Sequence, residues 1–116
     1  FVPKKKRPFP EFKAIVKYDL EENKTTVCSP LSENGNPMIL SESVFCPSSK
    51  RDHLNDAEED LGYITCFAHD EVTNKSECVL VDARTMQVTA NLSIPERVPN
   101  GFHGSWVHST PLQSKL

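Results

Sequence analysis

Apolar and polar residues alternate along much of this chain. Between positions 12 and 20, apolar side chains occupy every second position, with Lys13 and Lys17 between them. They are Phe12, Ala14, Val16, Tyr18 and Leu20. This period of two predicts a half-buried β-strand with these apolar side chains on one face. A polar turn follows at 21–24, and residues 25–28 are predicted to return as a second strand.

The same pattern continues towards the C-terminus. A short apolar strand is predicted around 44–46, and a long polar stretch follows at 48–60. Three further strands are predicted at 62–69, 78–81 and 86–94, separated by turns at 70–75 and 82–85. A last strand is expected within 98–107. No stretch has a helical period, so the chain is predicted to be all-β with short antiparallel strands. Repeated units of this kind are typical of β-propeller blades, and two blades alone would leave open edges.

Composition narrows the size and class of the protein. With 116 residues, the chain forms one domain at most, and its net charge of −3 argues against nucleic-acid binding. From its first residues we expect no signal peptide, and the sequence has no apolar run of transmembrane length. The chain starts with Phe1 rather than methionine, its apolar content is only 37%, and its histidine motif lies close to the end. Together these features lead us to expect a fragment of a longer protein. The basic cluster Lys4, Lys5, Lys6 and Arg7 favours a solvated loop over an import signal or a patch that binds an anionic surface.

The cysteines suggest a reducing environment. Cys28, Cys46, Cys66 and Cys78 are unevenly spaced and form no Cys-x-x-Cys pair, which argues against a zinc site. Cys66 and Cys78 lie in apolar strand patterns and are predicted to be small buried residues. The protein is therefore expected to be intracellular, with cytoplasm and plastid both left open.

The candidate chemistry lies near the end of the chain. His103 is placed between the apolar Phe102 and Gly104, and Trp106 and Val107 are expected to bury this segment. A histidine in such a setting suits a metal ligand or a general base, and the alternative is a structural core histidine. The other histidines, His53, His69 and His108, are predicted to be exposed. The acidic run 58–60 is interpreted as a solvated cap rather than an acid/base pair.

Four segments, in order, resemble the carotenoid cleavage oxygenases, a family that includes carotenoid and stilbene dioxygenases and the retinoid isomerase. Residues 98–107 (VPNGFHGSWV) are similar to the C-terminal signature of that family. Residues 14–20 (AIVKYDL), 58–64 (EEDLGYI) and 79–86 (VLVDARTM) resemble its earlier strands. The resemblance extends from about Phe12 to the end of the signature.

The resemblance implies a seven-bladed β-propeller with Fe(II) held on its axis by four histidines. The match assigns one of these iron ligands to His103. Family glutamates accept the second ring N–H of the ligands, and the segment Glu-Pro-Val/Ile-Phe matches Glu42-Ser43-Val44-Phe45, with Ser43 replacing the proline. Phe102 is expected either to line an apolar substrate tunnel or to pack in the core, and Trp106 is assigned to the core.

The implied activity is cleavage of a conjugated C=C bond of a carotenoid or apocarotenoid by O2, giving two carbonyl products. The expected partners are an apolar polyene or stilbene and O2, with peripheral membrane contact of the full-length protein left open. The chain would comprise an extended lead-in (1–11), blade strands (12–108) and a tail (109–116), and would be inactive alone. The alternatives are a stilbene-cleaving dioxygenase and a non-enzymatic β-blade interaction module. Asn100 and Trp106 depart from the Tyr and Phe common in plant carotenoid enzymes of this family, and they favour microbial or stilbene-type relatives.

Overall fold

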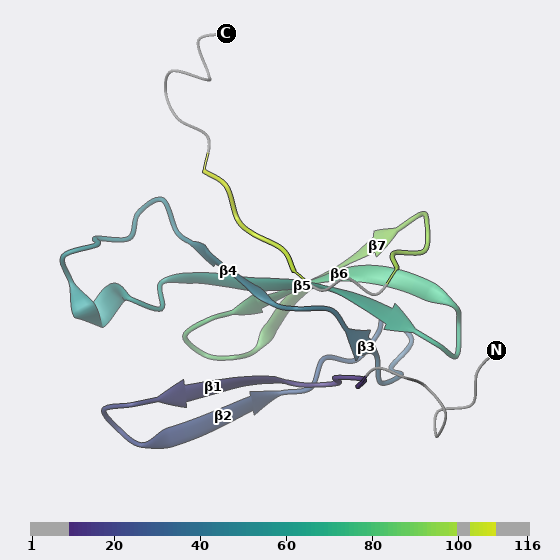
Figure 1. Cartoon of the computed structure of the whole chain (residues 1–116), viewed down its shortest axis with the longest axis horizontal. Helices are drawn as coiled ribbons and strands as arrows, with labels where there is room; N and C mark the ends of the chain where they lie inside the picture. Colours follow the sequence, from purple (N-terminus) through teal and green to yellow (C-terminus); the bar gives the residue numbers. More distant parts are fainter. Residues whose placement is uncertain (1–9, 100–102, 109–116) are drawn as a thin grey trace, which may run out of the picture.

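A computed structural model describes residues 10–99 and 103–108, and within these ranges the chain forms two antiparallel sheets (Figure 1). The strands are β1 (Ile15–Asp19), β2 (Lys24–Cys28), β3 (Ile39–Leu40), β4 (Val44–Pro47), β5 (Gly62–Asp70), β6 (Lys75–Asp82) and β7 (Val88–Ile94). A short 3-10 helix, η2 (Asp56–Glu58), interrupts the polar stretch before β5. The predicted all-β class is confirmed. No helix in the described part could span a membrane.

The two sheets differ in size and in the part of the chain that forms them. Strands β1 and β2 form a separate hairpin, whereas the larger sheet has the order β3–β5–β6–β7, with β4 also paired to β5. The predicted hairpin of β5 and β6 is confirmed, in a register that pairs Cys66 with Val79. Residues 103–108 run as an extended segment with no strand assigned, so the predicted final strand is wrong within these residues.

Three hairpin turns share one local design. Asp19, Asp70 and Asp82 each end a strand, and each carboxylate accepts the backbone N–H groups two and three positions later, at 2.8–3.3 Å. Four positions after each aspartate, the backbone turns left-handed, with φ between 51° and 58° at Asn23, Asn74 and Met86. Asparagine tolerates this conformation better than most residues, which explains two of the three positions.

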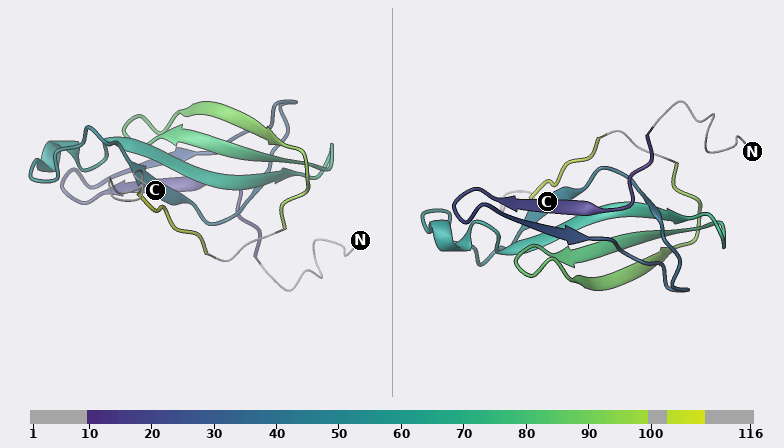
Figure 2. Two further views of the ribbon diagram at one scale, coloured as in Figure 1. Left: turned by 90° about the horizontal axis from the view of Figure 1, so that it is seen from above. Right: turned by 90° about the horizontal axis from the view of Figure 1, so that it is seen from below.

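The larger sheet has two distinct faces. On one face, Val79 and Val81 are fully buried and pack with Cys66, Met38 and Ile15 in the main core. Because Ile15 lies in β1, this core joins the hairpin to the larger sheet. The opposite face carries Thr65, Phe67 and Cys78, and the segment 103–108 lies on that side (Figure 2). The sheet therefore separates a packed layer from a more open one.

The hairpin has the opposite face inward from the one predicted. Val16 and Tyr18 are 60% and 52% exposed, whereas Ile15 is only 8% exposed. On the inward face, the Lys17 ammonium donates hydrogen bonds to Asp60 Oδ2 (2.6 Å) and to the carbonyl oxygen of Ala83 (2.8 Å). The period of two was therefore correct and the buried face was wrong, because a lysine with two partners replaces an apolar side chain.

The edge next to β5 is interrupted. Leu40 in β3 pairs with Ala68, and Val44 in β4 pairs with Thr65. Four steps along this edge thus correspond to three along β5, which leaves one extra residue in the interval 41–43. An extra residue of this kind disrupts the ladder locally and redirects a side chain. Glu42 lies in this interruption.

Candidate functional site

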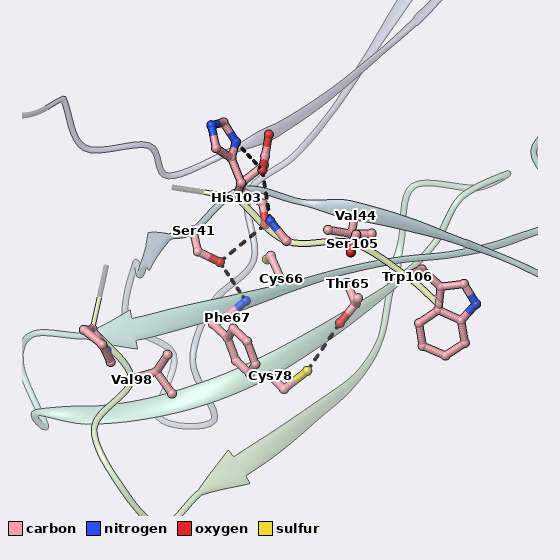
Figure 3. Close-up of a pocket in the computed structure, with 13 residues that line it drawn as sticks. Ser41, Val44, Thr65, Cys66, Phe67, Cys78, Val98, His103, Ser105 and Trp106 are labelled. Carbon is pink, nitrogen blue, oxygen red and sulfur yellow. Dashed lines mark hydrogen bonds and ion pairs between the residues drawn. The ribbon is translucent and has the colours of Figure 1, made fainter. Parts of the chain in front are cut away.

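The site is built around a contact between two distant parts of the chain. Glu42 Oε2 lies 3.0 Å from His103 Nδ1, and the backbone N–H of Gly104 donates to the same oxygen at 3.2 Å (Figure 3). A carboxylate that accepts the Nδ1 proton fixes the imidazole as the tautomer whose Nε2 carries a lone pair. The structure thus brings together two residues that the sequence assigned to one metal centre.

The surrounding backbone allows this approach. A Cβ added at Gly104 would lie 3.3 Å from the Val44 Cγ2 atom, so a larger residue there would press on β4. Glycine at 104 therefore lets the segment approach the sheet edge closely enough for its N–H to reach Glu42. Two residues on the other side of His103 in the sequence, Gly101 and Phe102, lie outside the described residues.

A cavity of about 490 Å³ opens beside the pair. Its floor is formed by Thr65, Phe67 and Cys78 of β5 and β6, and its other walls include Val98, Trp106 and the Glu42–His103 pair (Figure 3). The volume lies within the range typical of small-molecule sites. The arrangement therefore places a candidate metal-binding imidazole at the rim of a largely apolar cavity.

The donor set of the described residues fits one ligand of an Fe(II) site. The His103 side chain is 86% exposed, so its Nε2 is accessible to a metal, and Glu42 remains 46% exposed beside it. Neutral imidazole is a suitable ligand for Fe(II). Across residues 10–99 and 103–108, no three His, Cys, Asp or Glu side chains gather in a way that could hold a metal ion.

The exposure predicted from the sequence is wrong for two residues, His69 in β5 and Trp106 at the cavity. His69 was expected to be exposed, but it is 6% exposed, and its Nδ1 lies 3.1 Å from Ser76 Oγ. Trp106 was assigned to the core, but it is 51% exposed and lines the cavity. His69 is buried because it lies in β5 between two neighbouring strands, paired with Ile39 of β3 on one side and Ser76 of β6 on the other. Trp106 is exposed because its segment forms no strand.

The acidic run has a structural role in the fold. Asp60 binds Lys17 of β1, and its Oδ1 accepts a hydrogen bond from Arg84 Nε at 3.2 Å. Burial alone would raise the pKa of the Asp60 carboxyl, but the bonds from Lys17 and Arg84 outweigh it and lower the pKa. Asp60 therefore joins the hairpin to the turn after β6, a role that sequence spacing alone did not indicate.

The four thiols are free. Cys66 is 4% exposed, as predicted, and burial raises its pKa to about 11. Cys78 is only partly buried and lies 3.3 Å from Thr65 Oγ1 at the cavity floor. The expectation that Cys78 would be a buried small residue is therefore only partly met.

Comparison with known proteins identifies the relatives of this chain. The model of the family described as retinal pigment epithelial membrane protein (RPE65) matches residues 2–108. A carotenoid 9,10(9′,10′)-cleavage dioxygenase of Crocus sativus is 38% identical, covering 87% of this chain and 20% of the relative. A chromoplastic zeaxanthin 7,8(7′,8′)-cleavage dioxygenase of the same species is 34% identical, covering 93% of this chain and 30% of the relative.

A solved structure shares the fold. The structure of an ACO mutant from Synechocystis superposes with a TM-score of 0.68 and 29% identity, covering 86% of this chain and 19% of that one. The two sheets are therefore β-propeller blades like the corresponding part of that structure. The chain spans about a fifth of the length of that structure and of the 9,10-cleavage relative.

Proposed function

Because this chain belongs to the RPE65 family of carotenoid cleavage oxygenases, we propose that it is part of a non-heme Fe(II) dioxygenase. The whole enzyme cleaves a conjugated C=C bond of a carotenoid or apocarotenoid with O2, and each carbon of that bond becomes a carbonyl. The observation that supports this role is the double hydrogen bond of Glu42 to His103 and Gly104. This chain contributes one iron ligand, and the family resemblance implies three further histidines elsewhere in the oxygenase.

The chain's own residues prepare that ligand. Glu42 holds the Nδ1 proton of His103, which leaves the Nε2 lone pair available, and the Gly104 N–H keeps the carboxylate turned towards the ring. Fe(II), held by His103 and the further histidines, would supply the centre for dioxygen activation. Carboxylates that orient a ligand histidine typically contribute about 10–100-fold to metal affinity or activity.

The neighbouring cavity suits an apolar substrate. Phe67, Val98 and Trp106 give it apolar walls, and the ligand pair lies at its rim. We propose that part of a polyene occupies this space, with apolar walls that exclude water from the reacting bond. Phe102, which lies outside the described residues, remains a proposed tunnel residue.

The names of the relatives support a proposal about the compartment. The names of two relatives, a 9-cis-epoxycarotenoid dioxygenase of Oryza sativa and the zeaxanthin-cleaving enzyme, carry the terms chloroplastic and chromoplastic. We propose a plastid location and a carotenoid-type substrate on this basis. A stilbene substrate remains the alternative within the same family, and peripheral membrane contact remains a proposal for the whole enzyme.

Iron content and product analysis test the function. The full-length protein that contains this chain is compared with His103→Ala and Glu42→Gln, and with His53→Ala as a control at an exposed histidine. We expect His103→Ala to lose iron and cleavage, Glu42→Gln to bind iron about 10–100-fold more weakly, and His53→Ala to retain both. Unchanged iron and activity in His103→Ala would refute the ligand assignment.

The choice of substrate separates the alternatives. A carotenoid and a stilbene are assayed side by side with the wild-type protein, and the aldehyde or ketone products are identified by mass spectrometry. Carotenoid cleavage supports the proposal, whereas cleavage of the stilbene alone selects the other substrate class. Wild-type protein that binds no iron would instead favour a non-enzymatic interaction module.

A further inference from the structure

We propose that Ser41 is a positioning residue that holds Glu42 in the orientation required for His103. This inference rests on the proposed function of the Glu42–His103 pair and extends it to the residue behind the carboxylate. Ser41 lies in the interruption between β3 and β4, directly before Glu42, and lines the same cavity (Figure 3).

Ser41 forms two hydrogen bonds with Phe67 of β5, one through its backbone and one through its side chain. Its backbone N–H donates to the Phe67 carbonyl oxygen at 2.8 Å, and the Phe67 N–H donates to the Ser41 hydroxyl oxygen at 3.0 Å. In a regular antiparallel ladder, a backbone carbonyl accepts the second of these bonds. Here the Ser41 side chain takes the place of that carbonyl.

The Ser41 hydroxyl gives the Phe67 N–H an acceptor at the point where the extra residue interrupts the pairing of the edge with β5. The edge advances by four residues from Leu40 to Val44 while β5 advances by three. Because the hydroxyl satisfies the Phe67 N–H, the chain after Ser41 can leave the ladder without stranding a backbone donor. The hydroxyl also lies 3.4 Å from the Glu42 carbonyl oxygen, to which it donates.

Ser41 affects the His103 imidazole through the orientation of Glu42. The departure from the ladder begins at Ser41, and Glu42 is the next residue, with its Oε2 on His103 Nδ1 and the Gly104 N–H. Without the hydroxyl, the Phe67 N–H would favour a carbonyl from the edge strand. Drawing this carbonyl into the ladder would rotate the backbone and turn Glu42 away from His103. Ser41 touches neither His103 nor the reacting atoms, so it acts only through Glu42.

The test measures the histidine tautomer directly. Ser41→Ala removes the hydroxyl, Ser41→Thr retains it, and Ser43→Ala changes an exposed serine of the same interruption as a control. In the full-length protein without iron, the ¹⁵N shifts of the His103 ring report which nitrogen carries the proton. Hydrogen exchange of the Phe67 amide reports whether its acceptor is intact.

We expect the wild type, Ser41→Thr and Ser43→Ala to keep the proton on Nδ1 and to protect the Phe67 amide. Ser41→Ala is expected to shift the ring towards the Nε2–H form, to speed exchange at Phe67, and to weaken iron binding about tenfold. A Ser41→Ala protein that loses stability but keeps the wild-type tautomer would overturn the proposal. If Ser41→Ala does not fold, a Ser41→Thr protein with an altered tautomer would overturn it equally.

The outcomes also separate this inference from the proposed function. Loss of iron in Glu42→Gln together with a wild-type tautomer in Ser41→Ala would refute the role of Ser41 alone. Unchanged iron binding in both His103→Ala and Glu42→Gln would refute the metal site itself.

Discussion

Replacing Asp70 with alanine tests how much an aspartate that accepts turn N–H groups stabilises the fold. Of the three aspartates that do so, Asp70 is the most deeply buried. Asp70 is 0% exposed, and its carboxylate accepts hydrogen bonds from Asn36 Nδ2 at 3.0 Å, the Val72 N–H at 2.9 Å and the Thr73 N–H at 3.3 Å. Asp19 accepts two equivalent backbone bonds in the β1–β2 turn, but this turn is exposed. Asp19→Ala is therefore the matched control.

The difference in burial between Asp70 and Asp19 determines how much each substitution should lower the free energy of unfolding. Removing the buried Asp70 acceptor leaves its partly buried donors without a partner. A fully buried donor left unsatisfied costs about 1–3 kcal/mol and a partly buried one lies at the low end of that range, whereas exposed donors can bind water instead. Two side-chain donors, Ser32 and Asn36, and two backbone donors are affected. At about 1 kcal/mol for each of these partly buried groups, we expect Asp70→Ala to lower the free energy of unfolding by about 3–5 kcal/mol. For Asp19→Ala we expect about 0.5–1 kcal/mol, since only the turn bonds are lost.

The acid dependence of stability provides a second readout. Burial alone would raise the pKa of Asp70, but hydrogen bonds from Ser32, Asn36, Thr73 and Val72 outweigh it and hold the pKa well below its usual range. A lowered folded-state pKa gives stability that is present above the unfolded-state pKa, near 3.9, and lost as pH falls towards the folded-state value. Asp70→Ala should therefore flatten this acid-induced loss.

Urea unfolding of the wild type and both variants, between about pH 2.5 and 7, measures these effects. The reasoning is refuted if Asp70→Ala and Asp19→Ala lower the free energy of unfolding equally. It is also refuted if the acid dependence of Asp70→Ala matches that of the wild type.

Three further predictions address other contacts. Gly62→Ala would place a Cβ 2.3 Å from the Cys46 carbonyl oxygen, and it should destabilise the protein by about 1–3 kcal/mol in thermal unfolding; an unchanged Tm would contradict this close approach. Asp60→Asn should cost about 0.5–1 kcal/mol and weaken the loss of stability below pH 4, because the lowered pKa of Asp60 depends on its bonds to Lys17 and Arg84; a wild-type acid profile would argue against it. Iodoacetamide at pH 8 should modify Cys66 more slowly than Cys78, since burial raises the Cys66 pKa to about 11; equal rates by mass spectrometry would contradict this.

The strands and their pairing could be predicted because period-two patterns and polar turns are local. The β5–β6 hairpin and the antiparallel class follow from such patterns. The turn design was also present in the sequence, as an aspartate followed four positions later by asparagine at Asn23 and Asn74. Its third copy ends in Met86, which has no such preference and is 4% exposed in the core.

The buried faces could not be predicted from the pattern alone. A period of two shows that two faces differ, but not which one meets the core. In β1, Lys17 occupies the inward face because Asp60 and the Ala83 carbonyl, 43 and 66 positions away, accept its hydrogen bonds.

The candidate site was located through family resemblance rather than through patterning. The resemblance singled out Glu42 and His103, and the structure places them 3.0 Å apart. Their roles towards iron remain predictions. The contribution of Ser41 was missed because it depends on the offset of one residue between β3 and β4, which becomes visible only when both strands are paired with β5.

The contact between Glu42 and His103 also has a consequence for folding. The two residues are 61 positions apart, and the four strands β4–β7 lie between them in the chain. The loop that the contact closes is therefore long, and its closure entropy leads us to expect the pair to form after most of the larger sheet is in place. A metal held by His103 would bind only this assembled state, so its binding free energy would add to the stability of the sheet. The amount of bound metal would thus indicate how much of the protein has an assembled sheet, and metal binding would stabilise that state.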